Sequence, residues 1–443
     1  MSNPASGSPE QFASDSTYRK ITLRIVPLLF LCYMLNYMDR VNIGYAQLQM
    51  KHALNLSDAI YGLSASIFFL GYFIFEVPSN LLLHKIGVRK TLLRIMLGWG
   101  LASACTMFVT TPMQFYIVRF FVGMFEAGLF PGMVLYLTYW YPPARRARVV
   151  ALFMLATAAA GIVGGPIAGW ILQNMNDIYK LEGWQWMFLI EGLPCCLVGI
   201  FAYFYLADSP IKASWLTDAQ KSLVLGDVAA AAQTTAMKTR SAYTDPKVYL
   251  LSFVLFCILC GSYVIAFWLP TVIRELGVGN FQKIGFYAMI PDVLAIVCTI
   301  LYSHHSDKHL ERRWHFIIAA LVGALALSAT TLTGHSLGLS IMMFAIARAA
   351  IVSSLPIFWT MATSQLSTRS SIAGIAVISS MSNFSGMTSP FLIGLIKTAT
   401  GSLAYGMFAI SSLMVISALC VFFFVGREPR ACDAIDPTAM SRA

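Results

Sequence analysis

Long apolar stretches recur along the whole chain, and this repetition restricts the fold more than any other feature of the sequence. Six of them precede a polar segment at 207–246 and six follow it. They cover residues 22–46, 60–83, 91–110, 112–140, 147–173, 185–206, 247–270, 281–302, 314–333, 338–363, 371–397 and 402–425. About 20 consecutive apolar residues suffice for a helix that crosses a bilayer. The pattern therefore predicts an all-α polytopic membrane protein with twelve transmembrane helices in two bundles of six.

The composition excludes a water-soluble protein. Of the 443 residues, 58% are hydrophobic and only 11% are charged, whereas a typical soluble domain has about 25% charged residues. So few charges cannot cover the surface of soluble domains of this total size. The nine cysteines do not indicate a disulfide framework, because nearly all of them fall inside apolar stretches, where free cysteine behaves as a small hydrophobe.

The expected domain organisation follows the apolar stretches. We expect a cytoplasmic tail at 1–20, a six-helix bundle at 21–206, a cytoplasmic linker at 207–246, a second six-helix bundle at 247–426 and a cytoplasmic tail at 427–443. The first residues lack the short apolar core of a cleavable signal peptide. The first helix is therefore expected to serve as its own insertion signal.

Lysine and arginine report the orientation of the chain, because short cytoplasmic loops carry an excess of both. Of the 30 basic residues, 22 fall on the side of the N-terminus, five on the other side and three inside the apolar stretches. Both termini are therefore expected in the cytoplasm, with the protein in the plasma (inner) membrane. The net charge of +10 is then an orientation signal and does not indicate a nucleic-acid partner.

The two halves of the chain also share features at nearly constant separations. The paired residues are Pro131 with Pro356, Pro166 with Pro390, and His84 with Asp307. In each pair the separation is about half the chain, as expected after duplication of a six-helix bundle. Many transporter folds are built from such internal repeats. The sequence therefore predicts two pseudo-symmetric bundles.

Several motifs resemble a known family. The two six-helix halves, the basic loop at 80–90 and the polar linker are similar to the major facilitator superfamily over essentially the whole chain. Four segments resemble its anion:cation symporter branch: Asn36 to Asn42, Gly71 to Asn80, Arg119 to Gly132, and Glu191 to Pro194. The resemblance implies transport of organic anions such as sugar acids, dicarboxylates and aromatic acids, generally with protons. The basic loop departs from the superfamily pattern at His84 and Val88, where Asp and Arg are usual.

Four charged residues lie at bilayer depth in the first half: Asp39, Arg40, Arg119 and Glu126. Charges at such depth are costly and face a cavity or a partner. A guanidinium group binds a carboxylate through two hydrogen bonds, and a carboxyl group in a low-dielectric cavity binds a proton more readily. We therefore expect Asp39 and Glu126 in proton coupling, Arg119 as the main substrate anchor and Arg40 as its support. The alternative is two structural ion pairs between the first and fourth spans.

Two further charges lie deep in the second half. Asp292 is about eleven residues and Arg348 about ten residues from the outer end of its span, which is a similar depth at ~1.5 Å per residue. One interpretation is a structural ion pair, because a lone charge there costs more than a pair. In the other, Arg348 faces the cavity and offers a second anchor, which suits a dicarboxylate.

Polar and aromatic residues on the cavity helices are the candidates for substrate selectivity. By resemblance, Tyr37, Tyr72 and Asn383 are the best placed, and Trp359 and Trp268 are further candidates. Each aromatic residue has packing or a lipid-facing position as an alternative. Trp268, near the outer end of its span, also suits an interfacial belt or an outer gate.

Other residues are expected to have structural roles. The small-residue stripe Gly161, Gly165, Pro166 and Gly169 indicates close helix contact and gating. Glu76 precedes Pro78, where a broken helix would free backbone groups for a carboxylate. Glu191 is only a few residues inside its span, so we expect it in the outer headgroup zone.

Several signals of other functions are weak or missing. The sequence has no Gly-x-x-x-x-Gly-Lys-Ser/Thr loop for a nucleotide. Cys257 and Cys260 have redox spacing but lie within an apolar stretch, and His304, His305 and His309 fall in a loop whose family pattern is basic. We expect no metal, no cofactor and no enzymatic activity.

The sequence thus predicts a secondary active transporter that imports an organic anion with protons by alternating access. Its expected partners are the anion, protons and membrane lipids, and it is expected to work as a monomer. A proton-independent anion exchanger or facilitator is the first alternative. A membrane sensor that keeps the fold without transport is the second.

Overall fold

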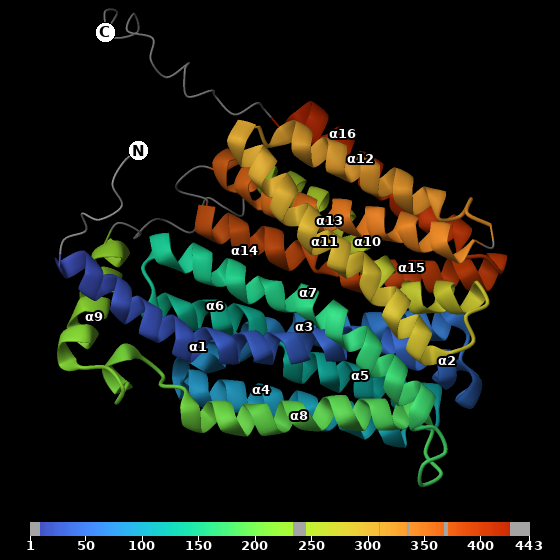
Figure 1. Cartoon of the computed structure of the whole chain (residues 1–443), viewed down its shortest axis with the longest axis horizontal. Coiled ribbons are helices and arrows are strands. Elements are labelled where there is room, and N and C mark those ends of the chain that lie inside the picture. Colours follow the sequence, from blue (N-terminus) through green and yellow to red (C-terminus); the bar gives the residue numbers. More distant parts are fainter. Residues whose placement is uncertain (1–8, 234–244, 310, 335, 367–370, 426–443) are drawn as a thin grey trace, which may run out of the picture. The chain divides into compact units, whose positions relative to one another are not determined.

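A computed structural model of the chain describes residues 9–233, 245–309, 311–334, 336–366 and 371–425. Within these residues, the long elements are all helices (Figure 1). The β-structure among them is one isolated bridge between Ile178 and Leu181. The prediction of an all-α fold is confirmed.

The number of apolar helices agrees with a polytopic membrane protein. In the described part of the chain, ten helical runs are long and apolar enough to cross a membrane, and the first of them, Ser14–Ala53, has 40 residues. The two other predicted spans correspond to the shorter apolar helix α12 (Arg313–Ala329) and to α14 (Ser371–Ser382) followed by α15 (Phe384–Thr400). The last two helices are interrupted at Asn383.

The described residues fall into two compact units. Unit 1 comprises the described residues of Met1–Leu56, Ile67–Ala236 and Asn280–Gly285, and unit 2 comprises those of Ser57–Ser66, Met237–Gly279 and Phe286–Ala443. The predicted tail at 427–443 lies outside the described residues.

Unit 1 holds the helices of the first half. They are α1 (Pro9–Val41), α2 (Ile43–Ala53), most of α3 (Asp58–Ile86), α4 (Val88–Cys105), α5 (Pro112–Glu126), α6 (Leu129–Trp140), α7 (Pro143–Asn174), α8 (Gly183–Tyr205) and α9 (Asp218–Gln233), with 3-10 turns at Thr106–Phe108 and Pro210–Lys212. α1 is helical from Pro9 on, so much of the predicted N-terminal tail continues the first helix. Tyr18 on this extension donates to Asp227 of α9 at 2.8 Å, which fastens the described part of the predicted linker to unit 1.

Unit 2 holds the remaining helices. They are α10 (Pro246–Glu275), most of α11 (Phe281–His309), α12, α13 (Leu337–Gln365), α14, α15 and α16 (Ala404–Phe424). Asp245 caps the N-terminus of α10 by accepting from the backbone N–H of Lys247 at 2.9 Å, and Pro246 follows at a position where its missing N–H costs nothing.

The fourth predicted span is divided at Gly128. α5 begins after Thr111, whose side chain accepts from the backbone of Gln114, and ends at Glu126. Ala127 then leaves the helical conformation with a ψ of 131°, and Gly128 has a φ of 88°, a conformation that glycine adopts without strain. The chain resumes as α6 at Leu129. The break therefore directly follows the charged residue Glu126.

Close glycine contacts repeat in both units. In unit 1, a Cβ on Gly285 would lie 2.1 Å from the carbonyl oxygen of Gly165, and one on Gly169 would lie 2.5 Å from that of Phe281. In unit 2, a Cβ on Gly62 would lie 2.4 Å from the carbonyl oxygen of Pro390, and one on Gly394 would lie 2.4 Å from that of Asp58. These positions match across the predicted repeat, because Gly62 precedes Gly285 by about half the chain, as Pro166 precedes Pro390.

The expected small-residue stripe lies at this contact. Gly165 and Gly169 face the first residues of α11, and Pro166 lies between them in the same helix. Gly161 precedes Gly165 by about one helical turn. The side chain of Gln173, farther along α7, accepts from the backbone N–H of Phe281 at 2.9 Å. This joint is thus held by backbone packing and a neutral hydrogen bond, while its role in gating stays a prediction.

Candidate functional site

Arg40 and Glu126 form a buried ion pair in unit 1. Arg40 Nε donates to Glu126 Oε1 at 3.0 Å, and Arg40 Nη2 donates to the same oxygen. The side chain of Glu126 is 0% exposed and that of Arg40 is 12% exposed. The second carboxylate oxygen, Oε2, is buried without a hydrogen-bond partner among the described residues. One of the two ion pairs foreseen as a structural alternative is therefore present.

The ring of Phe68 on α3 brings the two arginines of the site together. The guanidinium carbon of Arg40 lies 5.5 Å from the ring centroid, and that of Arg119 lies 4.9 Å from it. Arg40 also lies 5.3 Å from the ring centroid of Tyr72, one helical turn farther along α3. Such contacts stabilise a cation without using its N–H donors. These ring contacts therefore do not compete with hydrogen bonds from the arginines to carboxylates.

Asp39 lies beside Arg40 in sequence but in different surroundings. Trp99 Nε1 donates to Asp39 Oδ2 at 2.7 Å, and Ser103 Oγ and Asn42 Nδ2 donate to Oδ1, the latter at 3.2 Å. Asp39 is 1% exposed and interacts electrostatically with Arg119. Three uncharged groups therefore donate hydrogen bonds to the Asp39 carboxylate, and the positive charge of Arg119 attracts it.

Sequence reasoning missed Phe68, Trp99 and Ser103. Their signal was present in the spacing, because Phe68 and Tyr72 are four residues apart on α3, and Trp99 and Ser103 are four residues apart on α4. Residues at this spacing share one helix face. A hydroxyl and an indole N–H on one face of an apolar helix indicate a buried acceptor opposite them.

The expected position of Glu191 in the headgroup zone is wrong. Glu191 is 6% exposed and lies about 12 Å along α8 from its first residue. Asn42 Nδ2 donates to Glu191 Oε2 at 2.9 Å. The cause is a glycine contact, since a Cβ on Gly192 would lie 2.7 Å from the carbonyl oxygen of Gly100. α8 thus approaches α4 closely enough to bury Glu191.

The expected break at Pro78 is also absent. α3 continues as one helix from Asp58 to Ile86 with Pro78 inside it. The side chain of Asn80 donates to the carbonyl oxygen of Glu76 at 2.9 Å, whereas the carbonyl that loses its helical donor at Pro78 is that of Ile74. The helix break from which a structural role of Glu76 was predicted is therefore absent, and the role itself stays a prediction.

In unit 2, Asp292 and Arg348 are in direct contact. Arg348 Nε donates to Asp292 Oδ1 at 2.7 Å and Arg348 Nη1 donates to Ser262 Oγ at 2.6 Å. The side chains are 7% and 15% exposed for Arg348 and Asp292, respectively. This is the geometry that the structural interpretation requires. The two bonds occupy two N–H donors of Arg348.

The aromatic candidates have different surroundings. Trp268 is 0% exposed and packs edge-on against Tyr61 with 5.2 Å between ring centroids, so an interfacial belt is wrong for this residue. Tyr72 is buried, while Tyr37, Trp359 and Asn383 are half-buried. Asn383 lies at the interruption between α14 and α15.

Lys397 lies near Trp268 in unit 2. Its Nζ is 5.4 Å from the centroid of the Trp268 ring, donates to Glu275 Oε1 at 2.5 Å and is 3.5 Å from Asp58 Oδ1. The residue ends the predicted stretch 371–397 and belongs to the five basic residues expected on the outer side, yet it is 8% exposed. It is instead the centre of a cluster of three charges.

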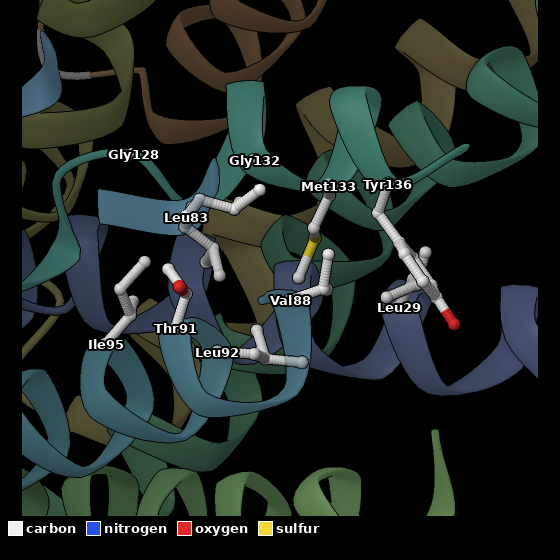
Figure 2. A pocket seen from close by; sticks show the side chains of 11 residues that line it. Leu29, Leu83, Val88, Thr91, Leu92, Ile95, Gly128, Gly132, Met133 and Tyr136 are labelled. Carbon is white, nitrogen blue, oxygen red and sulfur yellow. The ribbon is translucent and has the colours of Figure 1, made fainter. Parts of the chain in front are cut away.

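An apolar pocket lies elsewhere in unit 1 (Figure 2). Leu83, Val88, Leu92 and Met133 are among its lining residues. Tyr136 also lines it, but its hydroxyl group already donates to the carbonyl oxygen of Ala207 at 2.6 Å. The pocket has no charged lining residue, so it does not suit an anion.

Histidine side chains from the end of α11 and the start of α12 lie in contact. His305 Nδ1 lies 2.8 Å from His315 Nε2, and His315 Nδ1 lies 3.0 Å from Glu311 Oε2. Within the described ranges, no three His, Cys, Asp or Glu side chains are placed to hold a metal ion.

The chain was compared with protein families and with individual proteins. Residues 29–390 match the family model described as Major Facilitator Superfamily. The chain is 40% identical over 411 residues to "Putative metabolite transport protein NicT" from Pseudomonas putida, covering 92% of this chain and 94% of the relative. It is also 40% identical over 422 residues to "Putative tartrate transporter" from Agrobacterium vitis, covering 95% and 97%. A third relative is "Inner membrane transport protein RhmT" from Escherichia coli, at 32% identity over 92% of this chain and 95% of that protein.

Solved structures share the fold. A bacterial homologue of the human lysosomal transporter Spinster has a TM-score of 0.74 at 19% sequence identity and covers 90% of this chain and 95% of its own. The xylose transporter XylE from E. coli has a TM-score of 0.75 at 16% identity and covers 93% and 98%. The likeness extends over nearly the whole chain, so the prediction of this family's fold is confirmed.

Proposed function

Because the chain belongs to the major facilitator superfamily, we propose that this multi-pass membrane transporter imports a small organic anion together with one or more protons by alternating access. The substrate class is a carboxylate such as a sugar acid, a dicarboxylate or an aromatic acid. The observation that carries the proposal is the buried Arg40–Glu126 pair, which shares the Phe68 ring with a second arginine.

The proposal also assigns the chain to the anion:cation symporter branch and to the inner membrane. Its support comes from the motifs around Asp39 and Glu126 and from the names of its relatives. One relative is named for tartrate, which carries two carboxylates, and another for the inner membrane. An enzymatic function is not part of the proposal, because the family consists of transporters.

Glu126 couples the proton to the anion in this mechanism. As a carboxylate, Glu126 accepts from Nε and Nη2 of Arg40. A proton on Glu126 removes its charge and weakens both bonds, so that the two donors become available to a substrate carboxylate. Loss of the proton restores the pair and releases the anion. Proton and anion therefore move together, because these donors serve one carboxylate at a time.

The other site residues have supporting roles. Arg119 is the main anchor of the substrate carboxylate, and the released donors of Arg40 support it. Asp39, which interacts with Arg119, is the second proton-coupling residue. Tyr72 packs against Arg40 and helps to hold it. Tyr37, Asn383 and Trp359 are the candidates for selectivity.

Uptake into proteoliposomes tests this proposal. Purified protein should accumulate labelled tartrate, or an acid found in a thermal-shift screen of sugar acids, aromatic acids and dicarboxylates, when the outside is acidic. Glu126→Gln should abolish this uphill accumulation and spare counterflow exchange, because a neutral side chain no longer cycles its proton. The matched control is Glu182→Gln, which changes a helix-capping carboxylate at the start of α8 and should leave both activities intact.

Each contrary result identifies a different error. Normal accumulation by Glu126→Gln would contradict the role of this residue. Exchange that is independent of the proton gradient in the unmutated protein would favour an anion exchanger or facilitator. Binding without any flux would favour a sensor.

A further inference from the structure

A second buried carboxyl group lies beside Asp39. Asn42 Nδ2 donates to Asp39 Oδ1 at 3.2 Å and to Glu191 Oε2 at 2.9 Å. A single amide nitrogen thus bridges two carboxyl groups that come from different helices, α1 and α8. The two accepting oxygens are close neighbours, since both contact one nitrogen atom.

The bridge cannot neutralise two negative charges. Asn42 is uncharged, and Asp39 and Glu191 are 1% and 6% exposed, respectively. Arg119 acts electrostatically on Asp39, but one positive charge does not balance two negative charges. Two carboxylates this close in a buried site repel each other, and the arrangement that avoids this repulsion shares a proton between them.

The hydrogen bonds indicate which residue holds that proton. Asp39 accepts from three donors, namely Trp99, Ser103 and Asn42, whereas the side chain of Glu191 accepts from Asn42 alone in the described part of the chain. Glu191 Oε1 and Asn42 Oδ1 are both buried acceptor atoms without a described partner. A proton on Glu191 supplies the missing donor, because a carboxylic acid and a primary amide can pair through two hydrogen bonds.

The surroundings of Glu191 contain few other titratable groups. α1 contributes Asp39 and Cys32, α8 itself contributes Cys195 and Cys196, and Arg119 and Glu126 of α5 act on Asp39. α2, which also packs against α8, carries Tyr45, Lys51 and His52. The part of α4 that packs here, from Trp99 to Ser103, carries no titratable group, and neither does α7 between Ala151 and Gln173. Of these groups, Asp39 is the carboxyl group that shares an amide donor with Glu191, so the proton of Glu191 passes to Asp39 or to water.

We propose that Glu191 is a proton-binding residue of the transport cycle and forms a coupled carboxyl pair with Asp39 across Asn42. In the described arrangement Glu191 is the protonated member and Asp39 is the carboxylate. When the cycle opens the site to water, the O–H bond of Glu191 breaks and its proton leaves to water or to Asp39. The inference rests on the proposed proton coupling but adds a residue to it.

Infrared spectroscopy tests the protonation directly. A pH-difference spectrum of the reconstituted protein shows protonated carboxyl groups by their C=O stretching band. Glu191→Gln should lose one such band, Glu191→Asp should shift it in frequency, and Glu182→Gln at the start of the same helix should leave it unchanged. Glu191→Gln should also lower the number of protons moved per substrate, measured from the reversal potential of proteoliposome transport.

Two results would overturn the inference: a Glu191→Gln spectrum that keeps every band, or a lost band with the original proton count. If Glu191→Gln does not fold, an unshifted band in Glu191→Asp overturns it equally. The infrared result does not depend on transport. If the unmutated protein moves no protons at all, the proposed function fails, and the spectrum still reports whether Glu191 binds a proton.

Discussion

The pair formed by Asp292 and Arg348 gives a quantitative prediction, because its two interpretations have different energetic signatures. The bond between Arg348 Nε and Asp292 Oδ1 measures 2.7 Å, and the side chains are 7% and 15% exposed. Removing one member of a buried pair leaves an uncompensated charge and costs about 3–5 kcal/mol. The partial exposure of Asp292 puts the expected loss near the lower figure. Replacing both members by neutral amides should cost roughly 1 kcal/mol, the order of one hydrogen bond.

The perturbation is a double-mutant cycle of Asp292→Asn, Arg348→Gln and their combination. Thermal unfolding of the purified proteins measures the stability of each variant. A loss of about 3 kcal/mol corresponds to about 6–12 °C at 2–4 °C per kcal/mol for a unit of 150–250 residues. Each single variant should therefore melt at least about 6 °C lower, and the double variant should recover most of that shift. Lys308→Gln, at an exposed lysine of the same unit, is the control and should change stability by less than about 0.5 kcal/mol.

A double variant no more stable than the weaker single variant would refute the reasoning, because a structural pair requires coupling between the two positions. The substrate anchor predicts another pattern. In that case Arg348→Gln would keep the stability of the empty protein but lose its stabilisation by a dicarboxylate. Restored transport in the charge-swapped protein would show that Arg348 is not an obligatory substrate ligand.

Two further predictions concern the aromatic ring and the glycine contact of unit 1. Phe68→Leu removes a ring face from Arg40 and Arg119. Each such contact contributes about 0.5–2 kcal/mol, so substrate binding measured by calorimetry should weaken by at least about twofold. The control Phe121→Leu, at an exposed ring, should leave binding unchanged. Equal affinity in both variants would contradict the role of Phe68. Gly285→Ala places a Cβ 2.1 Å from the backbone oxygen of Gly165 and should lower the free energy of unfolding by about 1–3 kcal/mol. The control Gly279→Ala, whose Cβ meets open space, should leave stability unchanged. Equal stability of the two variants would contradict the importance of the Gly285–Gly165 contact.

The sequence was informative about the fold because the physics of membrane insertion is local. A run of apolar residues such as 247–270 is long enough to span a bilayer whatever its neighbours do, and it corresponds to α10 in the structure. The four charges in the first half stood out for the same reason. Each violates the local pattern, so it could be recognised without knowledge of any contact.

The unpredicted features depend on tertiary packing. Glu191 is near the start of its apolar stretch, and its burial results from the approach of two backbones at Gly100 and Gly192, which a single sequence does not reveal. Trp99 and Ser103 are ordinary in an apolar helix until Asp39 is placed against them. Lys397 ends its apolar stretch and was counted among the basic residues of the outer side, and only its contact with Glu275 explains its burial.

The duplicated joints of the two units have diverged in chemistry while keeping their backbone geometry. Gln173 and Lys397 are separated by about half the chain, like the glycines of these joints, and so occupy equivalent places in the repeat. In unit 1 the joint is closed by an amide that accepts from the backbone of Phe281. In unit 2 it is closed by an ammonium group between Glu275, which is 50% exposed, and Asp58. Dissolved ions screen exposed charges but have little effect on a neutral hydrogen bond. Rising ionic strength should therefore weaken the joint of unit 2 and leave the joint of unit 1 unchanged. Two joints with the same backbone geometry thus respond differently to salt.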